Sequence, residues 1–569
     1  MQTLIAALLF CSVPTHIAIA QRQSSPAGSA NSSPASAPQK REEPNAPRRP
    51  KPPPDVTTKE AVVEALSVIQ NNYATDRLAY DRLFKHSIVA MLRALDPHSD
   101  YMDPKEFAEQ KAEWARSEYS GIGATIGNRR TRAEELDTYI LSTFDNAPAR
   151  RAGLRFGDRI LAIDGQSVVG QFSNEVRDKL RGPRGTVVQV TVERSLDLSR
   201  ETFAITRVPV PQPTVSDSYL LRPGVGYIDL SGGFNFTTAD EFIAALEKLK
   251  SQGATSLVLD LRSNGGGIIA EAIKVAERFL QKDRQLVAQK GTGPLTGHAR
   301  AYYSSNSRPE TFPLVVLVGR STASAAEILA GALQDNDRAL IVGEPTFGKA
   351  LVQSIIGLDY GAGLTLTTSR YYTPSGRMIQ RDYSDISYYD YITRGGIDGS
   401  RNTPAPRGPA SRTSSGRLVY GGAIAPDQTG VIKPRLITPL QSRLIDPVFG
   451  FVRELINGRI VVAGVDTQKI RGFPDSQHNL QPDDFTVDDQ LLKAFKDYVA
   501  ANENIYKVTD TQVERERESI ARQIRFELAT AAYGAVKARQ VLIVDDPQVL
   551  KAIEVMPNAR TLASGAQTQ

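Results

Sequence analysis

Apolar residues recur along this chain with two different spacings, and the change of spacing divides it into segments. Between Thr58 and Leu95 they fall three and four residues apart, which predicts amphipathic helices. The apolar positions are Val62, Ala65, Leu66 and Ile69 on one face, and Leu83, Ile88, Leu92 and Leu95 on another.

Continuous apolar runs alternate with helical patterns between Gly224 and about Gln380. The runs are Val225 to Leu230, Leu257 to Leu261, Leu314 to Val318 and Leu340 to Gly343, and the helical stretches are Ile268 to Leu280 and Ala325 to Leu333. Alternating strands and helices predict an α/β core.

The segment from Tyr119 to Arg207 has a third character, with short β-branched strands between glycine turns. Val187 to Val192 is one such strand, and Asn146 to Gly165 contains a helix end, a turn and a hairpin in succession. This pattern resembles a PDZ domain.

The N-terminus reads as an export signal. Leu4 to Val13 is apolar but too short to span a bilayer, and Ala18-Ile-Ala20 has the small residues of a cleavage site. No Lys or Arg precedes the apolar run, so a buried N-terminal helix is the alternative. Cys11, the only cysteine, would leave with the signal, although a lipoprotein anchor at Cys11 is a second alternative.

These patterns predict a multidomain α/β protein with six segments. They are a signal peptide at 1–20, a disordered Pro/Ser-rich tether at 21–54, a helical domain at 55–118, a PDZ domain at 119–207, a catalytic core at 208–440 with an irregular loop at 382–416, and a mainly helical region at 441–569.

Charge and composition exclude several functions. The net charge is +5, but acidic and basic residues are interspersed, which disfavours nucleic-acid binding. No later stretch approaches the length of a membrane span, so no stable span is expected after signal removal. No metal or cofactor is expected, because the histidines that remain after signal removal show no metal-ligand spacing. These histidines are His86, His98, His298 and His478.

Ser324 and Lys349 carry the candidate chemistry. Ser324 lies between the apolar run ending at Val318 and a predicted helix from Ala325, and Lys349 lies in a glycine-bounded loop. A serine hydroxyl needs a base, and a lysine can serve when burial away from carboxylates lowers its pKa. Gln353 would share a strand face with Lys349 and accept a hydrogen bond from its amine.

Ser263 to Gly267 follows a predicted strand and opens a helix, so its amides can face outward. We expect Gly266 or Gly267, together with Ala325 at a helix N-terminus, to bind the oxyanion of an acyl intermediate. A phosphate-binding loop is the alternative, but the Lys and Ser/Thr of a P-loop do not follow. Asp260 and Arg262 are expected to form a structural ion pair, and His98 to be a structural histidine at a turn.

Four segments together resemble the carboxyl-terminal processing peptidases, also called tail-specific proteases. They are Leu95 to Pro104, Asp260 to Gly267, Gly319 to Glu327 and Gly343 to Gln353. The resemblance implies a crotonase-like or Clp-protease-like core with an inserted PDZ domain and flanking helical regions, and it matches Ser324, Lys349 and Gln353 to the catalytic serine, lysine and glutamine. Gly265 stands where the family has proline. Ser321 is a rival nucleophile, and Ser324 is preferred because its separation from Lys349 matches the family.

Ser120 to Gly123 matches the carboxylate-binding loop of PDZ domains. Gly121, Ile122 and Gly123 are therefore expected to bind the end of a substrate chain, which would add to the sheet as an edge strand.

We interpret the chain as an exported, periplasmic or extracellular serine endopeptidase that recognises protein C-terminal tails. A catalytically inactive PDZ scaffold and a crotonase-like acyl-transfer enzyme are the alternatives. The C-terminal region could support a homo-oligomer or an adaptor, and the sequence identifies neither the substrate nor the role of the residues after Arg381.

Overall fold

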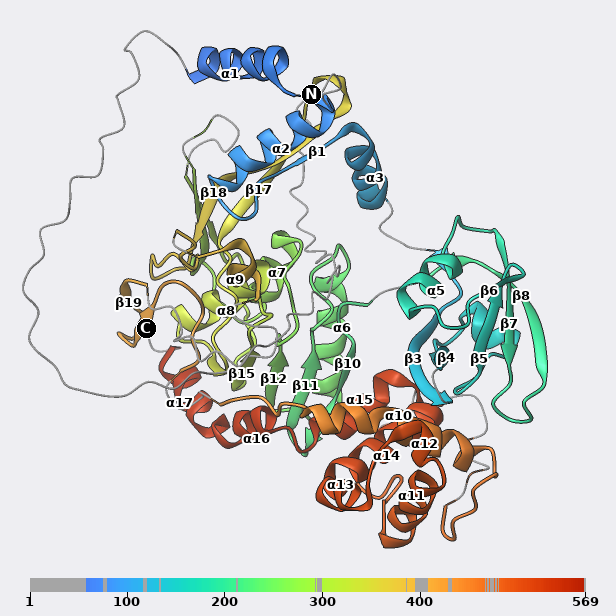
Figure 1. Ribbon diagram of the computed structural model, residues 1–569. Helices are drawn as coiled ribbons and strands as arrows, with labels where there is room; N and C mark the ends of the chain where they lie inside the picture. The colour runs from blue at the N-terminus through green and yellow to red at the C-terminus, as the bar shows by residue number, and fades with distance from the viewer. Residues whose placement is uncertain are drawn as a thin grey trace, which may run out of the picture. The chain divides into compact units, whose positions relative to one another are not determined.

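The computed structural model describes most of the chain from Thr58 onward (Figure 1). The described residues are 58–74, 79–115, 120–132, 135–210, 213–291, 293, 299–384, 386–393, 408–427, 432–465, 467, 470, 475, 478 and 480–566. The predicted signal peptide and tether, Cys11 and His298 lie outside these residues.

The chain divides into two compact units, of which the smaller is residues 12–94. Its described part contains helices α1 (Thr58–Asn72) and α2 (Tyr80–Arg93). The apolar face predicted on α1 is exposed, with Val62 at 54% and Leu66 at 39%. The helical periodicity therefore forms helices here, and this face is exposed within the described residues.

The remaining part of the predicted N-terminal helical domain belongs to the larger unit. Leu95 onward contains a short strand, β1 (Asp100–Met102), and a helix, α3 (Pro104–Ala115). Because β1 pairs antiparallel with β18 (Gly363–Tyr372), residues 100–102 extend a sheet of the core.

A second sheet corresponds to the PDZ pattern. Its strands run in the order β3-β4-β5-β7-β8, so β3 is at one edge, and α5 contacts it. The elements are β3 (Ala124–Arg132), β4 (Glu135–Thr143), α4 (Pro148–Ala152), β5 (Arg159–Ile163), β6 (Gln166–Ser167), α5 (Ser173–Leu180), β7 (Val187–Glu193) and β8 (Arg200–Thr206). A separate pair, β2 (Ser120–Gly121) with β9 (Val208–Pro209), joins the two ends of this segment.

The core sheet is parallel except at one edge strand and has helices on both faces. Its order is β10-β11-β12-β15-β16, made by β10 (Asp217–Arg222), β11 (Val225–Asp229), β12 (Ser256–Asp260), β15 (Leu314–Val318) and β16 (Leu340–Gly343). Only β10 is antiparallel to its neighbour. All four strand runs expected from sequence lie within a residue of the observed strand ends, and two of them coincide.

Alternate residues of these strands enter two different hydrophobic cores, because side chains alternate across a sheet. Leu257, Leu259 and Val316 pack with helices α6 (Thr238–Ser251), α7 (Ile269–Glu277) and α8 (Ala325–Asp335). Val258, Val315 and Leu317 pack with α16 (Pro547–Glu554) and α17 (Met556–Ala566). The C-terminal helices therefore complete the fold of the core.

A third sheet lies beside this layer. Its members are β1, β13 (Gln285–Lys290), β14 (Arg300–Tyr303), β17 (Leu351–Gly357) and β18. The loop that carries Lys349 leads from β16 of the parallel sheet into β17 of this one, so it connects the two sheets.

The segment after Arg381 includes regular secondary structure among its described residues, where an irregular loop was expected at 382–416. It contains α9 (Tyr388–Thr393), β19 (Ala410–Arg412) and β20 (Leu418–Tyr420) among its described residues. The last region is helical, as expected, and comprises α10 (Pro439–Ile456), α11 (Asp489–Ala501), α12 (Glu503–Tyr506), α13 (Asp510–Arg515), α14 (Arg517–Tyr533) and α15 (Ala535–Ile543), followed by α16 and α17. Gly534 separates α14 from α15.

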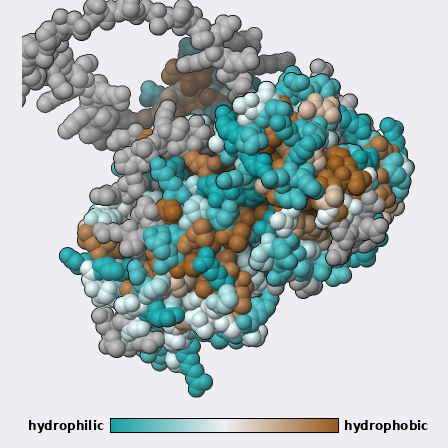
Figure 2. All heavy atoms as spheres, turned by 90° about the horizontal axis from the view of Figure 1, so that it is seen from below, coloured by the Kyte–Doolittle hydropathy of each residue, from teal (hydrophilic) through white to brown (hydrophobic). Residues whose placement is uncertain are grey.

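Figure 2 shows one face of the molecule, on which hydrophobic patches are interspersed with hydrophilic side chains. Within the described residues, no helix is long and apolar enough to cross a membrane.

Candidate functional site

Ser324 lies directly before α8, at the end of the turn that follows β15. Its backbone has φ +56° and ψ −118°, a conformation that is strained for a residue with a side chain. Its side chain makes no capping hydrogen bond, and the residue is only 3% exposed. Ser324 is therefore more than a helix cap. The rival Ser321 lies in the preceding turn and is exposed.

A buried carboxylate, Glu327, links the serine segment to the lysine loop. Its Oε2 accepts hydrogen bonds from the amides of Ser324 and Lys349, each at 2.8 Å. Its Oε1 accepts from the amide of Gly348 at 2.7 Å and from the hydroxyl of Thr346 at 2.5 Å. Because the amides of Ser324 and Lys349 donate to the same oxygen at 2.8 Å, their two nitrogen atoms can be no more than twice that distance apart.

The chemistry of Glu327 favours an ionised side chain at neutral pH. Burial raises its pKa to about 6, and the hydrogen bonds from Thr346, Lys349, Gly348 and Ser324 oppose that rise. An ionised carboxylate can accept all four hydrogen bonds, whereas a protonated one must donate from one oxygen. The arrangement is thus complete only when Glu327 is charged.

Lys349 precedes β17 and is buried, at 6% exposed. The preceding Gly348 has φ +86°, and a Cβ there would lie 2.4 Å from the carbonyl oxygen of Gly422. Only glycine fits this tight turn, which explains the glycine that bounds the loop. The loop shape, rather than strand alternation, sets the position of Lys349.

Gln353 lies two residues into β17 and is 5% exposed. Its Nε2 donates to the hydroxyl of Thr367 at 3.1 Å, while its Oε1 is buried with no hydrogen-bond partner among the described residues. A buried acceptor without a partner is costly in a folded protein and is typical of functional sites. The side-chain carbonyl is thus available to accept from an amine.

The glycine loop lies directly against the serine. A Cβ on Gly266 would be 2.8 Å from Cβ of Ser324 and 3.0 Å from the amide nitrogen of Ala325. The buried Asn264 fixes the loop, since its Oδ1 accepts from the Gly266 amide at 2.9 Å and its backbone carbonyl accepts from Ala323 at 3.0 Å.

The expected oxyanion donors differ in availability. The Gly266 amide already donates to Asn264. No acceptor is recorded within the described residues for the amides of Gly267 and Ala325, and Gly267 adopts φ +140° against the carbonyl of Phe234. Of the three candidates, Gly267 and Ala325 therefore have free amides.

The expected ion pair between Asp260 and Arg262 is present at 2.7 Å, and it extends further than the sequence indicated. Arg262 also contacts Asp546 at 2.8 Å and Gln548 at 3.0 Å, both at the start of α16. The strand that leads into the glycine loop is thereby tied to the C-terminal helices.

The predicted tail-binding residues lie in the PDZ segment, just before β3, and are separate from the serine cluster. Ile122 is buried at 4% exposed and belongs to the hydrophobic core of this domain. Gly123 has φ +72°, and a Cβ there would lie 2.4 Å from Cβ of Ala147. Gly121 is in β2, and the loop leads into β3 at the edge of the sheet.

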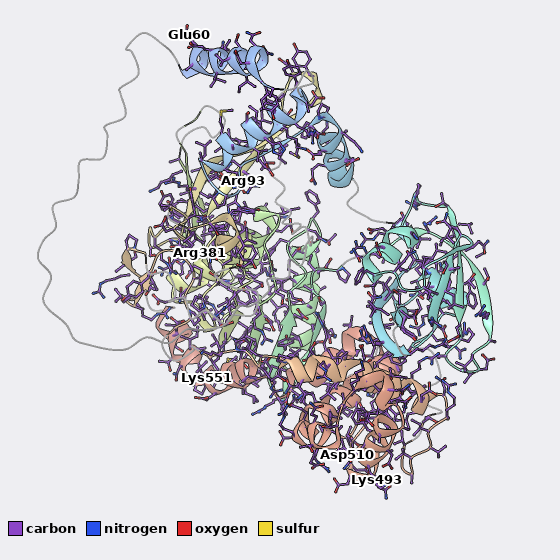
Figure 3. All side chains as sticks on the ribbon, in the orientation of Figure 1. Glu60, Arg93, Arg381, Lys493, Asp510 and Lys551 are labelled. Carbon is purple, nitrogen blue, oxygen red and sulfur yellow. The ribbon has the colours of Figure 1, made fainter. Side chains whose placement is uncertain are left out.

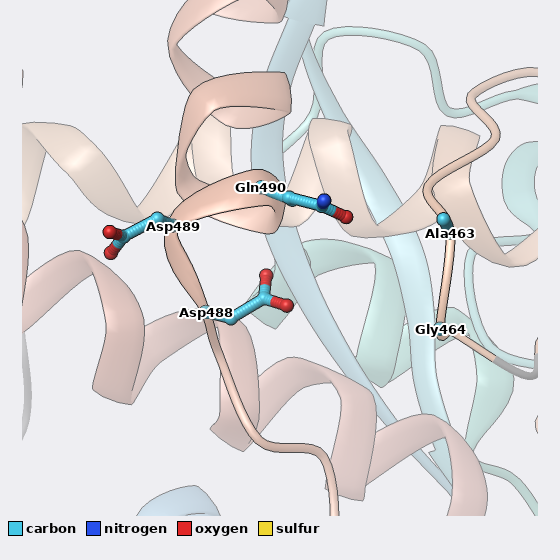
Figure 4. Close-up of a pocket in the computed structure, with 5 residues that line it drawn as sticks. All are labelled: Ala463, Gly464, Asp488, Asp489 and Gln490. Atoms are coloured by element: carbon cyan, nitrogen blue, oxygen red, sulfur yellow. The ribbon is translucent and has the colours of Figure 1, made fainter.

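Other candidate sites hold none of these residues. A hollow of about 550 Å³ is lined by Ala463, Gly464, Asp488, Asp489 and Gln490 (Figure 4), and Asp488 caps α11 by accepting from the Leu491 amide. No group of three metal-ligating side chains occurs in the part of the chain that the structure describes.

Sequence reasoning missed the linking roles of Glu327 and Asn264, although both lie in the quoted motifs. The Ser324 to Glu327 spacing is that of a capping box, which was a usable signal for Glu327. Its contacts with Thr346 and Gly348 are long-range and had no local signal.

Comparison with known proteins identifies the family. Residues 224–387 match the model of peptidase family S41, and residues 145–194 match the PDZ domain. The chain is 32% identical over 341 residues to the carboxy-terminal processing protease CtpB of Bacillus subtilis, covering 59% of this chain and 69% of that protein. It is 36% identical to a carboxy-terminal-processing protease of Bartonella bacilliformis, covering 52% of this chain and 67% of that protein.

Among solved structures, the photosystem II D1 C-terminal processing protease matches 57% of this chain and 91% of its own, with 30% identity and a TM-score of 0.33. The sequence similarity to the two curated relatives carries the assignment. Together with the S41 and PDZ matches, it shows that this chain belongs to the carboxyl-terminal processing peptidases, which are serine-type peptidases with a PDZ domain.

Proposed function

We propose that the chain is an exported serine endopeptidase that binds the C-terminal end of a protein through its PDZ domain and cleaves it with Ser324 and Lys349. The observation that carries the proposal is the contact of Glu327 with the amides of both residues. It supports a nucleophile and a base held in one rigid arrangement at the end of the core sheet.

In the acylation step, the uncharged amine of Lys349 takes the proton of the Ser324 hydroxyl while Oγ attacks the substrate carbonyl carbon. The negative charge moves to the carbonyl oxygen, which the amides of Gly267 and Ala325 stabilise by donating hydrogen bonds. One such donor typically contributes about 3 kcal/mol to transition-state stabilisation. The peptide bond then breaks as Lys349 returns the proton to the leaving nitrogen.

Deacylation repeats the proton transfers with water as nucleophile. Lys349 takes a proton from the water, which attacks the ester, and then returns it to Ser324 as the acid product leaves. The carbonyl of Gln353 orients the lysine amine by accepting one of its hydrogens, which is supported by its buried, unpartnered Oε1.

Substrate selection would occur at the PDZ sheet. The amides around Gly121, Ile122 and Gly123 bind the terminal carboxylate, and the peptide pairs with the edge strand β3, beside α5. The apolar core residue Ile122 favours an apolar last side chain.

Export is supported by the sequence alone. The apolar run from Leu4 to Val13 and the small residues Ala18 and Ala20 are typical of a cleaved signal. N-terminal sequencing of protein recovered from the periplasm or medium should give Gln21 as its first residue. Recovery only from the cytoplasm, with Met1 retained, would contradict export.

The test of activity uses two internally quenched peptides that differ only in a free or amidated C-terminus. The wild-type protein should cleave the free form faster, and both Ser324→Ala and Lys349→Ala should abolish cleavage. Unchanged hydrolysis by Ser324→Ala would refute this site, while a wild-type protein that binds the tails without cleaving them would indicate a scaffold.

A further inference from the structure

Tyr391 lies in α9, just beyond residues 224–387 that match the peptidase family model. It comes from the segment that sequence reasoning treated as an irregular loop. It is 1% exposed, so this short helix places a large polar-tipped side chain entirely inside the protein.

The Tyr391 hydroxyl is part of a hydrogen-bonded chain that ends next to Lys349. Nε2 of Gln380 donates to the hydroxyl at 3.0 Å, and Oε1 of Gln380 accepts from the amide of Ala350 at 2.9 Å. On its other side the hydroxyl is 3.0 Å from Nε2 of His98. Since the phenol oxygen accepts from Gln380, its own hydrogen can point to His98.

A second set of contacts reaches the residue before the lysine. The amide of Arg381 (labelled in Figure 3) donates to the carbonyl of Gly348 at 2.9 Å. The Arg381 guanidinium lies 4.6 Å from the ring of Tyr391 and 4.8 Å from the ring of Phe347, and it donates to the backbone carbonyl of Tyr391. Gly348 and Ala350, which flank Lys349, are thus both held by residues that Tyr391 contacts.

We propose that Tyr391 is a positioning residue for Lys349: it orients Gln380 and Arg381, which fix the main chain on either side of the lysine. The proposal rests on Lys349 being the base of the proposed function. It assigns a role in the reaction to the segment after Arg381.

Tyr391 acts through hydrogen bonding rather than proton transfer. Burial raises its pKa to about 12, so the phenol stays neutral in the working range of a peptidase. Without the hydroxyl, one buried amide hydrogen of Gln380 loses its acceptor. Among the described residues its Nε2 is then held only by the carbonyl of Arg381, at 2.9 Å, so the hydrogen bond of Gln380 with Ala350 is less firmly fixed.

The test compares Tyr391→Phe with a matched control, Tyr383→Phe. Tyr383 is a neighbouring tyrosine whose ring lies 6.1 Å from that of Tyr391, and its hydroxyl has no recorded hydrogen bond in the described part of the chain. Each substitution removes one oxygen and keeps the ring. Steady-state kinetics use an internally quenched peptide with a free alanine C-terminus.

We expect Tyr391→Phe to lower kcat about tenfold to a hundredfold, because small misplacements of a catalytic group have effects of that size. KM and the binding of the peptide to a Ser324→Ala background should not change, since the PDZ domain is untouched. Hydrogen exchange should quicken in peptic fragments that contain Ala350 and stay unchanged in fragments from the PDZ strands.

Unchanged kcat together with unchanged exchange at Ala350 would overturn the proposal. Exchange that quickens throughout the protein would also overturn it, because the effect would then be on global stability. Activity in Ser324→Ala would instead refute the proposed function, so the two failures are distinguishable.

Discussion

Replacing Glu327 by glutamine perturbs the contact that joins the segments carrying Ser324 and Lys349 while keeping the size of the side chain. The carboxylate accepts four hydrogen bonds, two at each oxygen. A glutamine keeps one oxygen and places an NH₂ group where the other stood. The two groups that donate to the replaced oxygen would then face an NH₂ donor instead of an acceptor.

The magnitude follows from these contacts. A hydrogen bond to a charged group contributes about 1.5–3 kcal/mol, so two lost bonds cost about 3–6 kcal/mol. A neutral amide avoids the desolvation that raises the pKa of Glu327 from 4.5 to about 6, which returns about 2 kcal/mol. The net loss is about 1–4 kcal/mol, or roughly fivefold to nearly a thousandfold in kcat/KM if it falls on the geometry of the site.

The assay is kcat/KM on a quenched peptide with a free C-terminus, with thermal unfolding measured in parallel. Glu344→Gln is the matched control: Glu344 lies in the same loop and pairs with Arg320, which is 41% exposed, at 3.2 Å. Such partly exposed pairs contribute about 0–1 kcal/mol, so this variant should retain near wild-type activity. Equal kcat/KM for wild type and Glu327→Gln would refute the linking role of the carboxylate.

Three further predictions follow from the same structure. As pH rises from about 4.5 to above 6, the unfolding free energy of the wild type relative to Glu327→Gln should fall by about 2 kcal/mol, because the raised pKa favours the protonated folded state; activity should rise over the same range, and a flat difference in denaturation curves would contradict this. Asp546→Asn keeps a good helix cap but loses its charge, so it should lower the melting temperature by a few degrees and kcat severalfold, whereas Asp545→Asn, which is 41% exposed and pairs with Arg435 and Arg522, should leave kcat unchanged. Gly123→Ala should weaken binding of a free-tail peptide about tenfold in fluorescence anisotropy, because its Cβ would clash with Ala147; Gly165→Ala, which also has positive φ but no close neighbour, should bind normally, and equal loss in both would point to unfolding of the domain.

The sequence predicted secondary structure well where it is determined by residues close together in the chain. The runs Leu314 to Val318 and Leu340 to Gly343 are strands with those bounds, and Ala325 begins α8. Buried parallel strands are continuous apolar runs, which are easily found in a sequence. The position of Ser324 follows from the apolar run before it and the helical pattern after it.

The contacts that assemble the site were beyond local reasoning. Glu327 accepts a hydrogen bond from Thr346, which lies in the loop before Lys349. Gln380 donates to Tyr391, which lies in α9, a helix within the segment that was predicted to be an irregular loop. These contacts depend on how distant segments pack, which a single sequence does not record. The strand alternation expected for Lys349 also failed, because β17 begins only at Leu351.

The N-terminal boundary shows the same limit. Asp100 to Met102 are followed by a helix and carry no long β-branched run, so they were grouped with the preceding helices. Their pairing with β18 makes them a strand, since a three-residue edge strand takes its structure from its partner.

The central claim is that Lys349 removes the proton from Ser324, and the rate at which a fluorophosphonate phosphonylates Ser324, with loss of fluoride, tests it most directly. Measured against pH, the wild-type rate should rise with a single deprotonation. In Lys349→Ala it should be about 10²–10⁴-fold lower, the usual contribution of a general base, and should no longer follow that deprotonation. A Lys349→Ala protein in which Ser324 is phosphonylated at the wild-type rate, with the same pH dependence, would contradict the account.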